Sequence, residues 1–393
     1  MTLRNGWTPD SNGHGSRDGA AAERHSETTP PQPATFAPLG TTSPTEAAPA
    51  LPAGAGIALP AEAAASLPAG AATALPTAAT PALPTAAATA LPTEATPALP
   101  AGAATALLAG AGIALPAGAT VVVTGGTSGL GREVVRRLAG DGYRVITVGR
   151  DPTRVEALRI QRGTAGPHNV AIAAVGDLST AAGCRSFAEF VAAQTDHVAA
   201  LINNAGVMSP RRVETADGLE LNFAVHHLAP FVLTSALLPL LRRFPAARVV
   251  NVNSAGHQTS LGGHHNPTLD FDDLQSRRGY DPFLAYSRSK LANLLFTYEL
   301  ARRHGTELVV NALHPGVVRT DLGRQWPRLQ VAAMQVFALS PARAAGPVAS
   351  LAIGPVGTQG AYYDRSTPVR SSPPSYDRNA ASHLWQLTEA LSG

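Results

Sequence analysis

The 393-residue sequence contains little cysteine, lysine, aromatic residue or charge. Its single cysteine, Cys184, excludes an internal disulfide and a cysteine-rich zinc site, and we expect no metal. Charged residues make up 15% of the chain and the net charge is only +3. The basic residues form no run, so no nucleic-acid partner is indicated. The N-terminus lacks the apolar stretch of a signal peptide, and the Ala/Gly-rich run 101–123 is a poor membrane span. We therefore expect a cytoplasmic protein without a membrane span.

Large apolar side chains are scarce in residues 1–118, which hold 17 of the 33 prolines but only two aromatic residues, Trp7 and Phe36. Leucine recurs every eight residues from Leu51 to Leu115, and proline follows nearly every copy. A proline in each unit blocks continuous helix and sheet, and the segment cannot bury enough apolar surface to offset chain entropy. We predict a disordered arm over 1–118 with Leu-Pro octapeptide repeats over 51–118. Two interpretations are open: a functional spacer or localisation arm, or a tolerated repeat expansion, which includes the case that it lies upstream of the true start.

Residues 119–393 are long enough for one sizeable core and contain 18 aromatic residues. Ala119–Thr124 is a β-branched run, the turn Gly125–Gly131 is rich in glycine, and Arg132–Ala139 is helix-like. A strand, a Gly-rich turn and a helix in this order present free backbone N–H groups to a pyrophosphate. The sequence therefore predicts an α/β domain of the Rossmann type, a doubly wound parallel sheet that binds a dinucleotide.

Polar residues follow the next predicted strands, where the ligand crevice of such a sheet lies. Arg150 follows the strand Arg144–Val148, and an arginine there would pair with a 2′-phosphate, which favours NADP(H) over NAD(H). The adjacent Asp151 leaves NAD(H) open, unless it caps the next helix. Asp177 ends the third strand, where it would contact the adenine or cap a helix, and Asn203–Gly206 ends the fourth.

Lysine is almost absent, because 29 of the 30 basic residues are arginine and the one lysine is Lys290. It lies four residues after Tyr286, so the two side chains share a helix face. Ser254 ends a buried strand whose edge should face that helix. Proton transfer to a carbonyl oxygen requires a donor, and a neighbouring ammonium should lower the pKa of the tyrosine. This arrangement predicts that Tyr286 is a general acid/base, with Lys290 and Ser254 assisting it.

In this order the motifs resemble the short-chain dehydrogenase/reductase family, and the surrounding sequence resembles its retinol-dehydrogenase-like and protochlorophyllide-oxidoreductase-like branch. The residues that carry the resemblance are Thr124–Gly131, Asn203–Gly206, Ser254, Tyr286, Lys290, Asp217–Glu220, Phe271–Gln275, Lys290–Asn293 and His314–Arg319. The resemblance implies hydride transfer between a nicotinamide cofactor and a carbonyl or alcohol substrate. The expected cofactor contacts are Gly125, Thr127, Ser128, Gly129, Leu130, Gly131, Arg150, Asp177, Leu178, Asn204, Ala205, Gly206, Tyr286, Lys290, Pro315, Gly316 and Val317.

Two positions depart from the pattern of that family. His226 stands where relatives often carry an asparagine that holds a water in a proton relay, and Asn253 stands where many carry serine. His226 is a candidate fourth catalytic residue, because a histidine of near-neutral pKa could relay protons itself. Its presence instead of asparagine also leaves an alternative open, a catalytically impaired cofactor-binding regulator or scaffold. A third alternative is a C=C reductase using the same Tyr286 and Lys290.

The remaining features constrain the function less. The long stretch 255–285 could shape the substrate pocket, and its histidines, among them His257, are expected in a solvated loop. Ala380–Leu391 is predicted to be an amphipathic helix that packs on the sheet edge. The sequence identifies neither the substrate nor the oligomeric state, so a monomer and a homo-oligomer both remain open.

Overall fold

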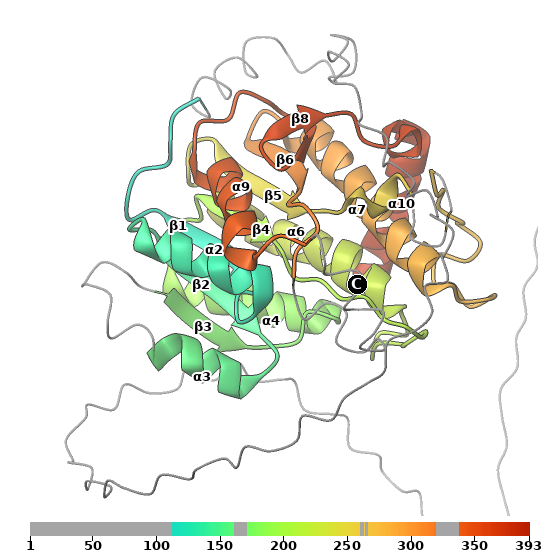
Figure 1. Cartoon of the computed structure of the whole chain (residues 1–393), viewed down its shortest axis with the longest axis horizontal. Coiled ribbons are helices and arrows are strands. Elements are labelled where there is room, and N and C mark those ends of the chain that lie inside the picture. The colour runs from blue at the N-terminus through green and yellow to red at the C-terminus, as the bar shows by residue number, and fades with distance from the viewer. Residues whose placement is uncertain (1–111, 161–170, 260–262, 264–265, 320–337) are drawn as a thin grey trace, which may run out of the picture. The chain divides into compact units, whose positions relative to one another are not determined.

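The computed structural model describes residues 112–160, 171–259, 263, 266–319 and 338–393. Within these residues the chain alternates strands and helices around one eight-stranded sheet (Figure 1). The strands are β1 (Thr120–Thr124), β2 (Arg144–Gly149), β3 (Ala171–Val175), β4 (Ala200–Asn203), β5 (Ala247–Val252), β6 (Leu308–His314), β7 (Ala361–Asp364) and β8 (Thr367–Val369). The predicted arm lies outside the described residues as far as residue 111.

The strand order is β3-β2-β1-β4-β5-β6-β7-β8, with β1 to β7 parallel and only β8 antiparallel to its neighbour. The order reverses at β1, where Val122 pairs with Ile146 of β2 on one side and with Leu201 of β4 on the other. This reversal is the topological switch point, where parallel α/β sheets bind their ligands at the carboxyl ends of the strands. The predicted doubly wound parallel sheet is confirmed.

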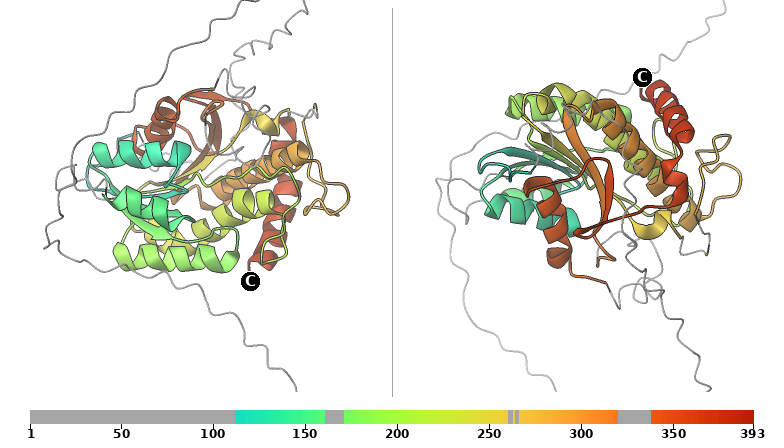
Figure 2. Two further views of the ribbon diagram at one scale, coloured as in Figure 1. Left: turned by 60° about the horizontal axis from the view of Figure 1, so that its bottom comes forward. Right: turned by 90° about the horizontal axis from the view of Figure 1, so that it is seen from above.

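Helices cover both faces of the sheet, as the two views in Figure 2 show. The helices are α2 (Gly129–Gly140), α3 (Pro152–Ile160), α4 (Ala181–Gln194), α5 (Leu221–Phe223), the π-helix η2 (Ala224–Leu228), α6 (Ala229–Leu241), the 3₁₀ turn η3 (Ala255–His257), α7 (Pro282–His304), α9 (Pro341–Ile353), the 3₁₀ turn η5 (Pro373–Tyr376) and α10 (Arg378–Ser392). Helices α2 and α9 pack on one face, and α4, α6 and α7 pack on the other.

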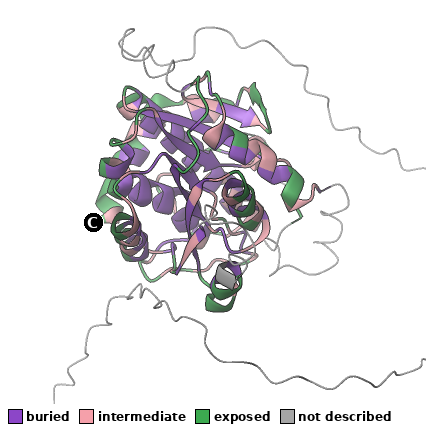
Figure 3. Ribbon diagram, turned by 90° about the vertical axis from the view of Figure 1, so that its left-hand side faces the viewer, coloured by how far each residue is buried: buried purple, intermediate pink, exposed green. Residues whose placement is uncertain are grey.

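The core consists of two apolar layers that the sheet separates. In β1, Val121 and Val123 point to the layer under α2 and α9, whereas Val122 points to the layer under α4 and α6. This alternation follows from the two-residue period of a strand, and it explains why the strands of a parallel sheet are apolar on both faces. The buried strands are coloured purple at the centre of Figure 3.

The continuous helical segment Leu221–Leu241 is long and apolar enough to cross a membrane, and 72% of its most apolar window is buried in the fold. Its leucines pack in the core, among them the fully buried Leu233 and Leu237. The apolarity of this segment is therefore used for packing against the sheet.

Helix α10 packs on α7 and α6, and the prediction that it lies on the sheet edge is wrong. The Trp385 ring lies 4.8 Å from the Phe231 ring and 6.0 Å from the Phe296 ring, measured between centroids. Thr388 forms a 2.7 Å hydrogen bond with Nε2 of His227 in the π-helix. The apolar face of α10 is buried with that of α7, where Leu384 belongs to one buried cluster with Leu291 and Leu295.

The packed part of the domain begins before the predicted boundary at residue 118. Leu115 is 7% exposed, its carbonyl accepts a 2.8 Å hydrogen bond from the Tyr143 hydroxyl, and its N–H donates to Ile353. Arg248, buried at 1% exposure, donates to the carbonyl of Ile113 at 2.7 Å. Leu115 belongs to the octapeptide series, so the last unit of the repeat is part of the folded domain.

We predict that Leu115→Ala lowers the free energy of unfolding of the full chain by about 2–4 kcal/mol, because it leaves a cavity in the layer under α9. Urea denaturation followed by tryptophan fluorescence would measure this loss. Leu59→Ala is the matched control, because the octapeptide Gly54–Ala61 is identical in sequence to Gly110–Ala117. Equal effects of the two substitutions would contradict the assignment of Leu115 to the domain.

Candidate active site

The Gly-rich turn after β1 comes into close contact with the loop after β4. Gly125 has a φ of 67°, a conformation that favours glycine. A Cβ on Gly131 would lie 2.2 Å from the carbonyl oxygen of Gly125 and 2.5 Å from Nδ2 of Asn204. A larger residue at either position would therefore displace the turn, which must remain open for a pyrophosphate to approach the backbone.

Helix α2 begins directly after this turn, with Ser128 at its N-cap. The Ser128 side chain caps no backbone N–H, so the N–H groups of the first turn, from Gly129 to Gly131, stay available to a ligand. The positive end of the helix dipole points the same way, which favours an anion at this position. Thr127 is 8% exposed, lies close to Gly149 of β2 and contributes to the wall of the turn.

The loop after β4 is hydrogen-bonded to the end of β1. The Thr124 hydroxyl accepts hydrogen bonds from the N–H groups of Asn204 and Ala205, both at 2.9 Å. The Asn204 side chain donates to the Thr124 carbonyl at 2.8 Å, so it holds the turn itself. Asn204, Ala205 and the following Gly206 therefore lie at the switch point, as the sequence predicted.

Arg150 and Asp151, adjacent at the end of β2, have different surroundings. The Asp151 carboxylate caps α3 by accepting from the N–H groups of Thr153 (2.9 Å) and Arg154 (3.3 Å), and it pairs with the Arg154 guanidinium. Within the described residues the exposed Arg150 side chain forms no hydrogen bond or ion pair. Asp151, the acid that left the cofactor preference open, is therefore hydrogen-bonded within the protein, whereas Arg150 is available to a ligand.

Asp177 and Leu178 follow β3. The exposed Asp177 carboxylate accepts a 3.0 Å hydrogen bond from the N–H of Ser179, and Leu178 is buried. The predicted alternative that Asp177 caps the next helix is wrong, because Thr180 caps α4 by accepting from the N–H of Gly183. The outer part of the Asp177 side chain faces solvent.

Three predicted catalytic residues come together where β5 ends against α7. Burial raises the pKa of Tyr286, and a side-chain hydrogen bond with Ser254 partly offsets that rise. The Lys290 ammonium lies 5.9 Å from the centre of the Tyr286 ring and donates a 3.1 Å hydrogen bond to the Val252 carbonyl. The site therefore places a hydroxyl, a phenol and an ammonium together near the carboxyl end of β5.

The electrostatics of this trio differ from the sequence-based expectation. Lys290 is 5% exposed, and burial lowers its pKa to about 7. The expected lowering of the Tyr286 pKa by the ammonium is not found, because burial outweighs the other contributions. Burial thus makes the charge of Lys290 costly, so an anionic group that binds nearby would stabilise the ammonium.

His226 lies beside the trio but is not a near-neutral group. Its Nε2 accepts from the N–H of Val207 at 3.1 Å, and its Nδ1 donates to the Ser289 hydroxyl at 2.8 Å. Burial, together with the charge of Lys290, holds the His226 pKa well below its ordinary value. The expected near-neutral pKa of His226 is therefore wrong, and both ring nitrogens are engaged in hydrogen bonds.

Sequence reasoning missed a set of buried amides that joins these elements. Asn253 donates to the Lys290 carbonyl (3.0 Å) and to Oδ1 of Asn293 (2.7 Å), and Asn293 donates to the His226 carbonyl (2.8 Å). Asn251 is part of a neighbouring set and donates to the Thr297 hydroxyl at 2.9 Å. The polar residues at alternate positions of an otherwise apolar strand were the available signal for them.

The remaining predicted residues lie around the end of β6. Pro315, Gly316 and the exposed Val317 follow that strand, and Gly316 has a φ of 91°. His257 was expected in a solvated loop, but this is wrong. It is fully buried, and its Nδ1 donates to the Ser254 carbonyl at 2.6 Å, so it supports the serine loop.

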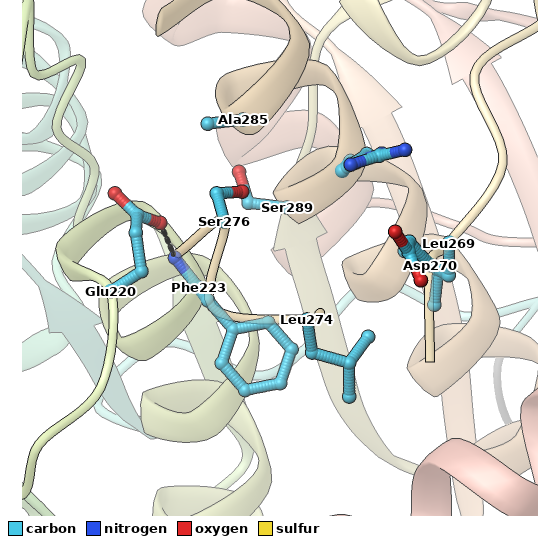
Figure 4. Close-up of a pocket in the computed structure, with 9 residues that line it drawn as sticks. Glu220, Phe223, Leu269, Asp270, Leu274, Ser276, Ala285 and Ser289 are labelled. Atoms are coloured by element: carbon cyan, nitrogen blue, oxygen red, sulfur yellow. Dashed lines mark hydrogen bonds between the residues drawn. The ribbon is translucent and has the colours of Figure 1, made fainter. Parts of the chain in front are cut away.

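A small pocket lies between the helix that begins at Leu221 and the start of α7 (Figure 4). Glu220, Phe223, Leu274 and Ser289 are among its lining residues. The Glu220 carboxylate accepts from the N–H of Phe223 at 2.9 Å and caps the helix, and burial raises its pKa. No group of three or more metal-binding side chains occurs in the part of the chain that the structure describes.

Comparison with known proteins gives the same assignment as the site. Residues 119–264 match the model of the short chain dehydrogenase family. Mouse retinol dehydrogenase 14 is 36% identical over 292 residues, which cover 69% of this chain and 85% of the relative. Human retinol dehydrogenase 13 is 37% identical with 69% and 84% coverage. The chain belongs to the short-chain dehydrogenase/reductase family, in its retinol-dehydrogenase-like branch.

A solved structure agrees with this membership. An uncharacterised protein from Mycobacterium paratuberculosis aligns with a TM-score of 0.55 and 34% identity, over 71% of this chain and 95% of that one. The chain is therefore an NAD(P)-dependent oxidoreductase that acts on alcohol or carbonyl groups. The turn after β1 fits a dinucleotide, because its tight glycine contacts leave the α2 N-terminus open.

We predict that Lys290→Met stabilises the protein most at low pH. The pKa of Lys290 is about 7 in the folded protein and 10.5, its unperturbed value, in the unfolded chain. Between these two pH values the unfolded chain therefore binds more protons than the folded protein. The stability of the wild type should therefore rise with pH across that window. The gain from Lys290→Met, about 3–5 kcal/mol below the window, should vanish above it. Urea unfolding of both proteins at a series of pH values, without added nucleotide, measures the difference. A gain independent of pH would contradict the prediction.

Proposed function

We propose that this protein transfers hydride between NADP(H), in preference to NAD(H), and a carbonyl or alcohol substrate, with Tyr286 as the general acid/base. The observation that carries the proposal is that the chain's one lysine is buried beside Tyr286 and Ser254. A nicotinamide cofactor, when bound, supplies or accepts the hydride. Ser254 holds the substrate oxygen, Tyr286 exchanges a proton with it, and Lys290 places positive charge behind the phenol.

The preference for NADP(H) is supported by the two residues that follow β2. Arg150 is exposed and available to a 2′-phosphate, whereas the carboxylate of Asp151 is occupied by the N–H groups of α3. A carboxylate facing the ribose would repel that phosphate, and here it is directed to the helix. Pseudomonas aeruginosa RhlG, whose structure is an NADP complex, is 24% identical with a TM-score of 0.51, which indicates the shared fold alone.

The substrate is proposed to be an apolar alcohol or its aldehyde, because the relatives that cover the domain are retinol dehydrogenases. We also propose that the protein acts in the cytoplasm and binds neither nucleic acid nor, through a spanning helix, a membrane. Whether it works as a monomer or a homo-oligomer is a matter for light scattering of the purified protein.

We predict that Tyr286→Phe lowers turnover by about 10²–10⁴-fold, because it removes the proton donor while keeping the ring. NADPH binding, followed by nicotinamide fluorescence, should change little. The assay is nicotinamide absorbance over a panel of alcohols and carbonyls that includes retinol and retinaldehyde. Full activity in Tyr286→Phe would refute the role of the tyrosine.

The same panel distinguishes the alternatives. A wild-type protein that binds NADPH but turns over no compound would favour the regulator or scaffold. A product reduced at a carbon–carbon double bond would favour the C=C reductase.

We predict that Arg150→Ser weakens NADPH binding by about 10–100-fold, the value of one or two charge-assisted hydrogen bonds, and hardly affects NADH. Arg154→Ser is the matched control, because it removes the same charge from a nearby arginine that is already paired with Asp151. Titration of both nucleotides by fluorescence measures the ratio of affinities. Equal losses for NADPH and NADH in Arg150→Ser would argue against contact with the 2′-phosphate.

A further inference from the structure

The Asn253 side chain is hydrogen-bonded both to the backbone of Ser254 and to helix α7 at Lys290. It follows β5 and is 4% exposed. Its Oδ1 accepts from the N–H of Ser254 at 2.7 Å. Its Nδ2 donates to the Lys290 carbonyl at 3.0 Å and to Oδ1 of Asn293 at 2.7 Å. One amide therefore fixes the distance between the backbone of Ser254 and the turn of α7 that carries Lys290.

His226 holds the same part of α7 from the opposite side. Its Nε2 accepts from Val207 in the loop after β4, and its Nδ1 donates to Ser289. The Ser289 hydroxyl donates in turn to the Tyr286 carbonyl at 2.6 Å. The His226 ring also packs edge-on against the Tyr286 ring, with 5.4 Å between centroids and an 89° angle. Because Nε2 accepts a backbone N–H, the ring proton must be on Nδ1.

The two sides are joined through Asn293. It accepts from Asn253 and donates to the His226 carbonyl at 2.8 Å, inside the π-helix η2. The residues from Tyr286 to Asn293 are thereby enclosed in one buried hydrogen-bond network. Buried networks of this kind specify one geometry, because an unpaired buried polar group is costly. Asn253 and His226 are also the two positions that depart from the pattern of the family.

We propose that His226 and Asn253 act as a pair of positioning residues that hold the turn Tyr286–Lys290 in register with Ser254. The inference deepens the proposed function, because it assumes that these three residues bind and protonate the substrate oxygen. Neither positioning residue exchanges a proton with the substrate. If the phenol moved by a fraction of a hydrogen-bond length, the rate of proton transfer would fall more than the affinity for substrate would.

Asn253→Ser introduces the residue that many relatives carry and removes every bond made by the amide. We expect kcat to fall about tenfold while KM for substrate and cofactor changes by less than about threefold. Tyr298→Phe is the matched control, since Tyr298 lies further along α7 and its hydroxyl forms a 2.6 Å hydrogen bond with Ser371, outside this network. The control should lose stability to urea and keep its kcat. A loss of stability with unchanged kcat in Asn253→Ser would overturn the proposal.

His226→Asn tests the other side and does not depend on the folding of an Asn253 variant. Asparagine is too short to span Val207 and Ser289, so we expect kcat to fall about tenfold. A rise in kcat would instead mean that asparagine restores a proton relay, which would overturn the proposal. In the double variant the loss should be smaller than the product of the two single losses, because both act on one turn. Multiplicative losses would overturn the pairing.

Amide hydrogen exchange of the full chain, read by mass spectrometry, tests the same inference without turnover. Asn253→Ser and His226→Asn should both speed exchange in the peptide that contains 286–293, and Tyr298→Phe should not. Unchanged exchange in this peptide would overturn the positioning role. A protein that shows the exchange change but oxidises or reduces nothing on the panel would fail the proposed function while keeping the positioning network.

Discussion

Burial of the Lys290 ammonium is the constraint on which the catalytic side of the molecule depends. The side chain is 5% exposed, its ammonium donates a hydrogen bond to the Val252 carbonyl, and burial lowers its pKa to about 7. A buried cation is tolerated only where polar groups face it. Here the Val252 carbonyl accepts from the ammonium, and Asn253 donates to the backbone carbonyl of Lys290 and so holds the helix turn that carries the charge. The amide directly after β5 thus fixes the backbone that positions this one charge.

The cofactor side depends on a different constraint, the close approach of β1 and β4. Thr124 joins the two strand ends through its hydroxyl, and Gly131 permits the contact with Asn204. Because β4 pairs with both β1 and β5, the position of the Gly-rich turn is transmitted to the strand that ends near Ser254. The two halves of the site are therefore built on neighbouring strands of one rigid sheet, the arrangement expected at a switch point.

The sequence was sufficient to predict the elements whose signals are local. The strand–turn–helix around Gly125, the Tyr286 and Lys290 pair and the strand end at Ser254 each occupy a short stretch with a clear period. The bonds between elements could not be predicted, because they depend on register over long separations. Asn253 meets Asn293 forty residues later, and the tautomer of His226 is set by Val207. The burial of a histidine, and so its pKa, follows from such contacts.

The same reasoning explains why the domain boundary could not be read from composition. The octapeptide Gly110–Ala117 has the composition of the repeats, and nothing in it predicts an ordered structure. The order of residues 112–117 comes from partners elsewhere in the chain, the Tyr143 hydroxyl and the Arg248 guanidinium, which also binds the carbonyls of Ala352 and Gly354. A buried arginine must find acceptors for its donors, and the backbone of a Leu-Pro unit supplies one because it forms no ladder of its own. The end of the repeat is therefore held on the domain by hydrogen bonds, one of which comes from Arg248 of β5.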